Sequence, residues 1–177
     1  MTFTAPNPDY ATAIPAMFER IPAAGFIGFT FASLTPGRAV LHLEKRPELL
    51  THIGTFQAAI IGALIDFAGG AACGTVLDTG RTLVSQDYTC RLLAPAQADR
   101  LVAVAQVLSK SRSTYTAEVS VYCDMERGTL CGHGTLTCRA TTTRALRQQK
   151  PVACCQHLFY SAASLERPNS SVGRATD

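Results

Sequence analysis

Charged residues are scarce in this 177-residue chain, at 16% of the total, and the main part of the chain has almost no net charge. Residues 1–138 hold 10 Lys and Arg against 11 Asp and Glu, a net charge of −1. Residues 139–177 hold 6 against 2, a net charge of +4, so the basic excess lies in the last part. Without a basic face in the body of the chain, we expect no nucleic-acid partner.

The start of the chain, MTFTAPNPDY, lacks the basic and apolar stretches of a secretory signal. The cysteines number seven, an odd count, and we expect them to be free thiols in a cytoplasmic protein. Cys131, His133 and Cys138 suggest a metal ion only weakly, because a second close pair of ligands does not accompany them. We therefore expect no metal site.

The hydrophobic content of 47% and the length predict one folded domain, over residues 1–140. Residues 11–20 predict a short helix. Strand-like alternation or enrichment in β-branched and aromatic residues predicts strands at 25–34, 39–46, 82–93, 100–110, 113–123 and 129–138. Residues 141–177 sustain no period of 2 or 3.6, so we expect a disordered tail there.

Residues 56–77 form an apolar stretch with one charge, Asp66, and by length they could cross a membrane. A carboxylate near the bilayer centre costs on the order of 3 kcal/mol, however, and the strands on both sides need a core partner. We expect a buried helix and no membrane span. The predicted fold class is α+β, with an antiparallel sheet around one long central helix.

The start of this helix and Asp66 are the candidate sites of chemistry. The first amides of a helix lack intrahelical partners, so those of Ala58 and Ala59 can polarise a carbonyl group. Asp66 is costly to bury unless it is paired or functional. It follows Ala58 by 8 residues, about 12 Å along a helix. If both act on one carbonyl, a second copy of the chain must bring them together.

Four segments resemble the PaaI-type branch of the hotdog-fold thioesterases. They are RPELLTHIGTFQAAIIGALIDFAGGAA, LVSQDYTCRLLAPA, RLVAVAQVLSKSR and GTLCGHGTL, within a span from Arg46 to about Arg139. The resemblance implies a hotdog fold, a homodimer or homotetramer, and hydrolysis of acyl-CoA thioesters. It implies no cofactor, because a thioester is already reactive and needs mainly orientation and charge stabilisation.

The resemblance also assigns residues by position. Asp66 matches the catalytic acid, and Ser85 matches a residue that helps to position water or the acid. Ala58 falls where a glycine amide binds the thioester oxygen, while Gln57 replaces a common histidine and Thr51 a common asparagine. Gln57 can donate a hydrogen bond but cannot shuttle a proton as histidine does.

Substrate-binding positions are expected on both sides of this set. Gly54 precedes the polar motif and Ala59 follows it. The corner at Lys110, Ser111 and Arg112 resembles the region that meets the phosphates of CoA.

Two other functions stay open at this point. The changes at Thr51, Gln57 and Ala58 also fit a catalytically weak hotdog domain that binds acyl-CoA or serves as an assembly module. A hydratase is disfavoured, because no histidine follows Asp66 until His133.

Overall fold

A computed structural model describes residues 3–142 and 144 of the chain. Within these residues the fold consists of helices and strands in an α+β arrangement. In chain order the elements are α1 (Tyr10–Phe18), α2 (Pro22–Ile27), β1 (Thr30–Thr35), β2 (Arg38–Glu44), the 3-10 helix η1 (Pro47–Leu49), α3 (Ala58–Thr75), β3 (Thr82–Tyr88), β4 (Arg91–Leu92), β5 (Arg100–Lys110), β6 (Thr114–Cys123) and β7 (Leu130–Thr141).

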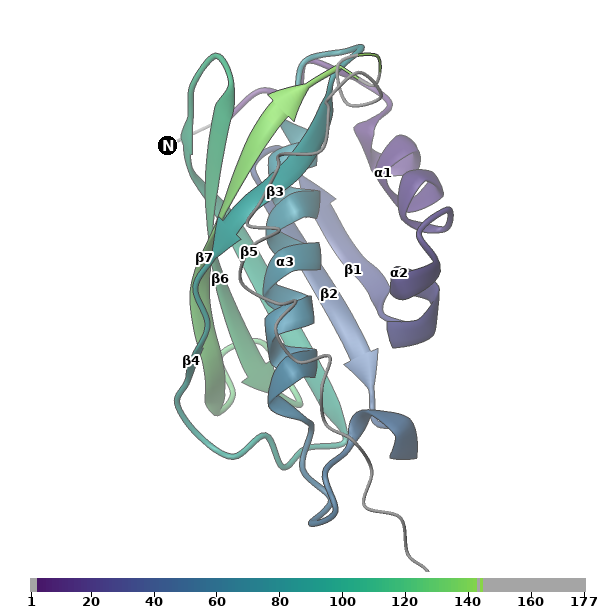
Figure 1. Ribbon diagram of the computed structural model, residues 1–177, viewed down its shortest axis with the longest axis vertical. Helices are drawn as coiled ribbons and strands as arrows, with labels where there is room; N and C mark the ends of the chain where they lie inside the picture. Colours follow the sequence, from purple (N-terminus) through teal and green to yellow (C-terminus); the bar gives the residue numbers. More distant parts are fainter. Residues whose placement is uncertain (1–2, 143, 145–177) are drawn as a thin grey trace, which may run out of the picture.

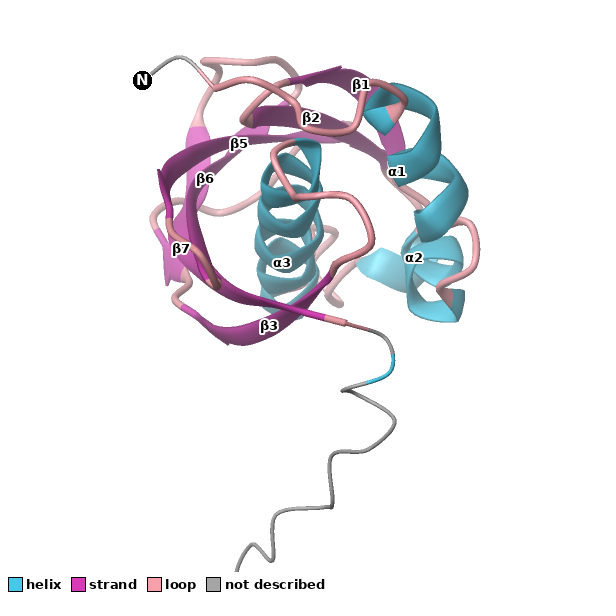
Figure 2. Ribbon diagram, turned by 90° about the horizontal axis from the view of Figure 1, so that it is seen from above, coloured by secondary structure: helices cyan, strands magenta, loops and turns pink. Residues whose placement is uncertain are grey.

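The strands form one antiparallel sheet in the order β1-β2-β5-β6-β7-β3, and the short β4 also pairs with β7. The sheet curls around α3, as the view along the helix shows (Figures 1 and 2). Helices α1 and α2 lie beside α3, across the opening between the two edge strands β1 and β3 (Figure 2). The predicted fold class, a sheet wrapped around one long helix, is confirmed.

Helix α3 is buried because its side chains are apolar or small on nearly every face. Leu64, Ile65, Ala68, Ala71 and Ala72 are fully buried between the sheet and the N-terminal helices. Among the described residues, α3 has the length and hydropathy of a membrane-crossing helix, yet 61% of it is buried within the fold. The composition that suggests a membrane span therefore serves the core of the wrapped sheet.

The strand predicted at 25–34 is wrong in its first half, where the chain forms α2. Pro22 occupies the first turn of this helix, where its missing N–H costs nothing, and Gly28 ends it in the left-handed conformation at φ +77°. Strand β1 begins only at Thr30. Of the aromatic residues in this stretch, Phe26 is exposed, whereas Phe29 and Phe31 pack in a cluster of edge-to-face and tilted rings with Phe18 of α1 and Phe67 of α3.

The strand predicted at 82–93 is interrupted after Tyr88. There the regular pairing with β7 is broken, and the backbone N–H of Thr89 donates a 2.8 Å hydrogen bond to the Thr135 carbonyl oxygen. Gly134 makes this approach possible, because a Cβ atom at that position would overlap with the carbonyl oxygen of Thr89. Pairing with β7 then resumes at β4, from Arg91.

The expected domain boundary at residue 140 lies close to the end of β7 at Thr141. The expected tail lies almost entirely outside the described residues, which after 142 include only residue 144.

Substituting Gly134→Ala tests the close approach of Thr89. The added methyl has no free space, so the free energy of unfolding should fall by about 1–3 kcal/mol, the usual cost of overpacking. Gly25→Ala is the matched control, since a Cβ there meets nothing within 4 Å, and it should change stability little. Urea denaturation followed by circular dichroism measures both. Equal effects of the two substitutions would contradict this packing.

Candidate functional site

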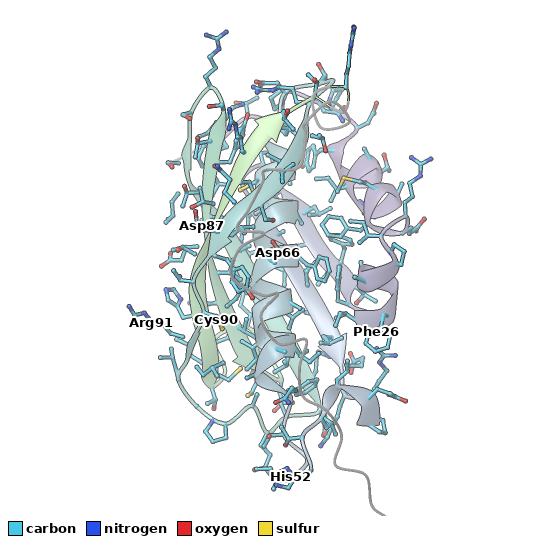
Figure 3. All side chains as sticks on the ribbon, in the orientation of Figure 1. Phe26, His52, Asp66, Asp87, Cys90 and Arg91 are labelled. Atoms are coloured by element: carbon cyan, nitrogen blue, oxygen red, sulfur yellow. The ribbon has the colours of Figure 1, made fainter. Side chains whose placement is uncertain are left out.

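Asp66 and Ser85 meet between the central helix and the edge strand β3. Asp66 lies in the middle of α3 and is half-buried (Figure 3), while Ser85 stands on β3 and is exposed. The Ser85 hydroxyl donates a 2.6 Å hydrogen bond to Oδ1 of Asp66. Such a short bond to a carboxylate holds its orientation and leaves Oδ2 for another partner. The structure thus brings these two expected site residues together, and their catalytic roles stay predictions.

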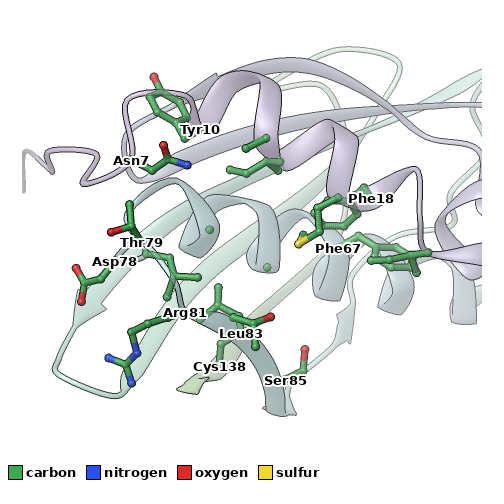
Figure 4. Close-up of a pocket in the computed structure, with 18 of the residues that line it drawn as sticks. Asn7, Tyr10, Phe18, Phe67, Asp78, Thr79, Arg81, Leu83, Ser85 and Cys138 are labelled. Carbon is green, nitrogen blue, oxygen red and sulfur yellow. The ribbon is translucent and has the colours of Figure 1, made fainter. Parts of the chain in front are cut away.

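A cavity of about 390 Å³ opens beside this pair, between α1, α3 and β3 (Figure 4). This volume is in the range of small-molecule sites. Its lining is mostly apolar, with polar groups at Asp66 and Ser85 and again at the loop after α3. A carboxylate that lines a largely apolar cavity is a chemically useful acid or base.

Two cysteine thiols, Cys138 and Cys73, lie near the Asp66 carboxylate. Cys138 on β7 is paired with Ser85 across the sheet and lines the cavity, and Cys73 on α3 is its neighbour. A hydrogen bond from Cys73 lowers the pKa of Cys138 below its usual value, against the opposing effect of burial. The same hydrogen bond, together with burial, raises the pKa of Cys73. This pair could not be inferred from the sequence, because the two cysteines are far apart in the chain.

The start of α3 lines a separate cavity of about 400 Å³. Thr51, Gln57 and Ala58 contribute to it, together with the corner after β4 at 92–96. The side-chain Oε1 of Gln57 accepts a 3.1 Å hydrogen bond from the backbone N–H of Ala58. The amide proposed to polarise a carbonyl is therefore occupied by its own neighbour. Gln57 must move aside before Ala58 can donate to a ligand.

The loop before α3 is braced by its own residues. The backbone N–H of Gly54 donates a 3.0 Å hydrogen bond to the carbonyl oxygen of Thr51. The hydroxyl groups of Thr51 and Thr55 lie 2.9 Å apart. Ala59 is exposed at the next helical position, where its amide has no partner one turn earlier in the helix. The sequence-predicted residues at 51–59 thus gather at one end of α3.

The two parts of the predicted site do not meet within one chain. No residue of the described chain lines both cavities. Between Ala58 and Asp66 on the same helix face lies Gly62, and the Tyr88 hydroxyl would be 3.3 Å from a Cβ at that position. Tyr88 is half-exposed and stands on β3. Its place between the two parts could not be inferred from the sequence, which shows only an aromatic residue near a strand end.

The corner at residues 110–112, expected to meet the phosphates of CoA, has hydrogen-bond partners within the chain. Lys110 Nζ donates to the Val76 carbonyl oxygen at 2.7 Å and lies 3.1 Å from Asp78 Oδ1, so it caps the end of α3. Ser111 closes the turn with Thr114 through hydrogen bonds of 2.8–3.1 Å. Arg112 is exposed. The Lys110 ammonium group is thus paired within the chain, whereas Arg112 is exposed.

The remaining histidine candidates lie away from both cavities. His52 is exposed on the loop before α3 (Figure 3). His133 lies on the outer face of the sheet, with Nδ1 at 3.2 Å from the Ser120 hydroxyl and Nε2 at 3.4 Å from Glu118. Within residues 3–142 and 144, no cluster of His, Cys, Asp and Glu side chains is arranged to hold a metal ion.

The residues that match a family model are nearly the same as those that form the fold. Residues 12–141 match a family described as "Domain of unknown function (DUF4442)". The chain belongs to DUF4442. This DUF4442 chain is also similar in structure to a thioesterase family protein from Silicibacter pomeroyi, with 24% identity and a TM-score of 0.71 over 75% of this chain and 98% of that one.

Two other solved structures agree with this fold. The Escherichia coli PaaI protein, from the phenylacetic acid degradation operon, is 21% identical with a TM-score of 0.64, over 72% of this chain and 89% of its own. A mutant thioesterase from Pseudomonas aeruginosa is 15% identical, with a TM-score of 0.68 over 77% of this chain and 97% of that one. A comparison with curated proteins gives no sequence match. The DUF4442 chain therefore has the hotdog fold that these solved structures share, as the PaaI-type resemblance predicted.

Lys110→Met tests the capping of α3. The loss of its hydrogen bonds to the Val76 carbonyl oxygen and Asp78 should lower the free energy of unfolding by about 1 kcal/mol. Lys45→Met is the matched control, because its ion pair with Asp99 spans 3.7 Å at the surface and should contribute less than about 0.5 kcal/mol. Thermal and urea denaturation measure both variants. A larger loss at Lys45 than at Lys110 would contradict the capping role.

Proposed function

We propose that this protein hydrolyses acyl-CoA thioesters to the free acid and CoA. The observation that carries the proposal is the Asp66–Ser85 hydrogen bond of 2.6 Å at the wall of a largely apolar cavity. An apolar cavity suits an acyl group, and the carboxylate beside it suits activation of water. The shared fold with thioesterases agrees with this chemistry but does not by itself assign it.

In the proposed reaction, Asp66 accepts a proton from water while the water oxygen bonds to the thioester carbon. Ser85 keeps the carboxylate in place through its hydrogen bond. The carbonyl oxygen gains negative charge, and backbone N–H donors at a helix start would stabilise it. The C–S bond then breaks, CoA leaves as the thiolate and takes up a proton, and the free acid remains. No metal or other cofactor takes part in these steps.

We further propose that the helix start belongs to a second copy of the chain. Ala58 and Asp66 are about 12 Å apart on one helix, too far to touch one carbonyl group. The edge strand β3 and the segment at β4 expose several apolar or aromatic side chains that a partner could cover: Val84, Tyr88, Leu92 and Leu93. In such a homodimer, Asp66 of one protomer would face Ala58 and Gln57 of the other, in two equal sites.

Contacts to the rest of the substrate follow from the same arrangement. Gly54, Thr51 and Ala59 border the helix start and are proposed to contact the thioester arm. At the corner after β5, Ser111 is engaged in its turn and Lys110 at the end of α3, so Arg112 is the proposed partner of a CoA phosphate. We expect the reaction to take place in the cytoplasm.

One observation favours a second function, acyl-CoA binding without turnover. The Ala58 amide is bonded to Oε1 of Gln57, which leaves that oxyanion donor occupied. If Gln57 does not move when substrate binds, the protein would hold acyl-CoA or assemble through it without hydrolysis. Tight binding of acyl-CoA together with no CoA release would select this function.

The direct test of hydrolysis is CoA release from short, medium, long and aryl acyl-CoAs, with product acid measured by mass spectrometry. Wild type should turn over at least one substrate, and Asp66→Asn should lose about 10²-fold or more in kcat, since it removes the positioned base. Asp99→Asn is the control for the same chemical change at an exposed surface carboxylate. Full activity of Asp66→Asn would refute the assigned role.

Ala58→Pro tests the amide donor without unfolding the helix. Ala58 is the first helical residue and Gln57 before it is extended, at φ −67° and ψ 140°, so proline fits at this position and removes only the N–H. We expect kcat to fall about 10²-fold or more, with the melting temperature unchanged. An unchanged kcat would show that another group stabilises the oxyanion.

Mixed dimers test whether the site is shared. An equimolar mixture of Asp66→Ala and Ala58→Pro chains, unfolded and refolded together, should regain about a quarter of wild-type activity, because half of the dimers would carry one intact site. Each variant refolded alone is the control and should stay inactive. No recovery in a mixture that demonstrably forms hybrid dimers would place both residues' roles within one chain.

A further inference from the structure

The cavity beside Asp66 is elongated along α3. It runs from Asp66 past Gly70 and Gly74, which follow at intervals of four residues and so share one helix face. The distance from Asp66 to Gly74 is about 12 Å at 1.5 Å per residue. Figure 4 shows Phe67 and Ser85 at one end of the cavity and Asn7 and Thr79 at the other. The space is therefore a channel that leads away from the carboxylate.

Gly70 keeps the floor of this channel open. A Cβ at Gly70 would meet nothing within 4 Å, although the residue lies in the middle of a packed helix. At Gly74, one turn further, a Cβ would already contact Ile14 of α1 at 3.4 Å. A glycine inside a helix is less stable than alanine, and no neighbouring atom requires one at position 70. The absent side chain leaves room in the channel.

The walls of the channel between its two ends are made of hydrocarbon side chains. They come from α1, α3 and β3, and they are Ile14, Met17, Phe18, Phe67 and Leu83. Apart from Asp66 and Ser85, the polar lining comes from the segment before α1, the start of α1, the loop after α3 and the start of β3: Asn7, Tyr10, Asp78, Thr79, Arg81 and Thr82. An acyl chain needs no hydrogen bonds along such walls. The pantetheine arm of CoA carries two amides, and these would lose their hydrogen bonds with water along such walls.

The length of the channel also separates two kinds of acyl group. A single aromatic ring would occupy only the first turn beyond Asp66 and leave the rest of the channel unfilled. The rings of Phe18 and Phe67 pack edge to face with each other, at 6.0 Å between centroids. Phe29 also contacts both, edge to face with Phe18 and tilted against Phe67. Both rings are thus already held by the aromatic cluster. A flexible chain fills the space past Gly70 better.

We propose that this channel takes the unbranched, medium-length acyl chain of the substrate, and that Gly70 determines how far the chain extends. The proposal deepens the proposed thioesterase function and rests on it for the position of the thioester group at Asp66. A single protomer would then determine which length of acyl chain fits, through the face of α3 that also carries the carboxylate.

The test is binding of S-alkyl-CoA thioethers, which cannot be hydrolysed, to the full-length protein by isothermal titration calorimetry. Decyl-CoA, ethyl-CoA, 2-phenylethyl-CoA and free CoA are compared on wild type, Gly70→Leu and Gly25→Leu. Gly25 is the matched control, a helical glycine that is exposed and has nothing within 4 Å of a Cβ. Gly70→Ala, which favours the helix, serves if the leucine variant does not fold.

Wild type should bind decyl-CoA more tightly than the phenylethyl and ethyl compounds. Gly70→Leu should weaken the binding of decyl-CoA by about tenfold or more, because several methylene groups lose their place in the channel. The affinity for ethyl-CoA should stay within about twofold of wild type. Gly70→Ala should show the same pattern with a smaller loss, and Gly25→Leu should show none. If Gly70→Leu weakened the binding of free CoA as much as that of decyl-CoA, the pantetheine arm would occupy the channel. If it did not weaken the binding of decyl-CoA, the alkyl chain would bind elsewhere. Either result overturns the proposal. Because the ligands are not hydrolysed, these results are independent of whether the protein has thioesterase activity.

Discussion

The burial of α3 inside the curled sheet is the constraint on which the rest of the structure depends. Five central residues of this helix are fully buried, and its apolar surface needs contact on nearly all sides. The sheet provides most of that contact, and α1 closes the remaining side through the aromatic cluster of Phe18 and Phe67. The face that carries Asp66 is the part of α3 left least covered, between α1 and β3 (Figure 2).

A carboxylate in this position has a cost that the structure only partly offsets. Ser85 supplies one short hydrogen bond, and the adjoining cavity lets solvent or substrate reach the other oxygen. A purely structural acid would be expected to carry more partners, such as an arginine. The combination of one fixed oxygen, one open oxygen and an apolar channel is the physical basis for treating Asp66 as the reactive group.

The wrapped sheet and its helix were predictable because their signals are periodic and strong. Alternation placed β5, β6 and β7, and the apolar run with its single carboxylate placed α3. Helix α2 was missed because glycine and phenylalanine within GFIGF favour no helix by themselves, while Pro22 and Gly28 determine its ends. The break between β3 and β4 depends on the contact of Thr89 with Gly134, 45 residues away in sequence, and no local pattern records it.

The candidate site was predictable in its residue types and only partly in its geometry. The Asp66–Ser85 pair could be anticipated only from the PaaI-type resemblance, which places both residues by position. The engagement of Lys110 with the end of α3 could not, because it depends on how the β5–β6 corner meets Val76. The same holds for the hydrogen bond that occupies the Ala58 amide and for the channel above Gly70, which becomes visible only once α1 is in place.

The most direct test of the central claim is a crystal structure of the protein with a ketone analogue of decanoyl-CoA, in which a methylene replaces the thioester sulfur. The account predicts that the ketone carbon lies near Asp66 of one protomer, with its oxygen within about 3 Å of the Ala58 amide of the other protomer. It also predicts the alkyl chain in the channel above Gly70. A ketone group bound away from Asp66, or held by one protomer alone, would contradict the account.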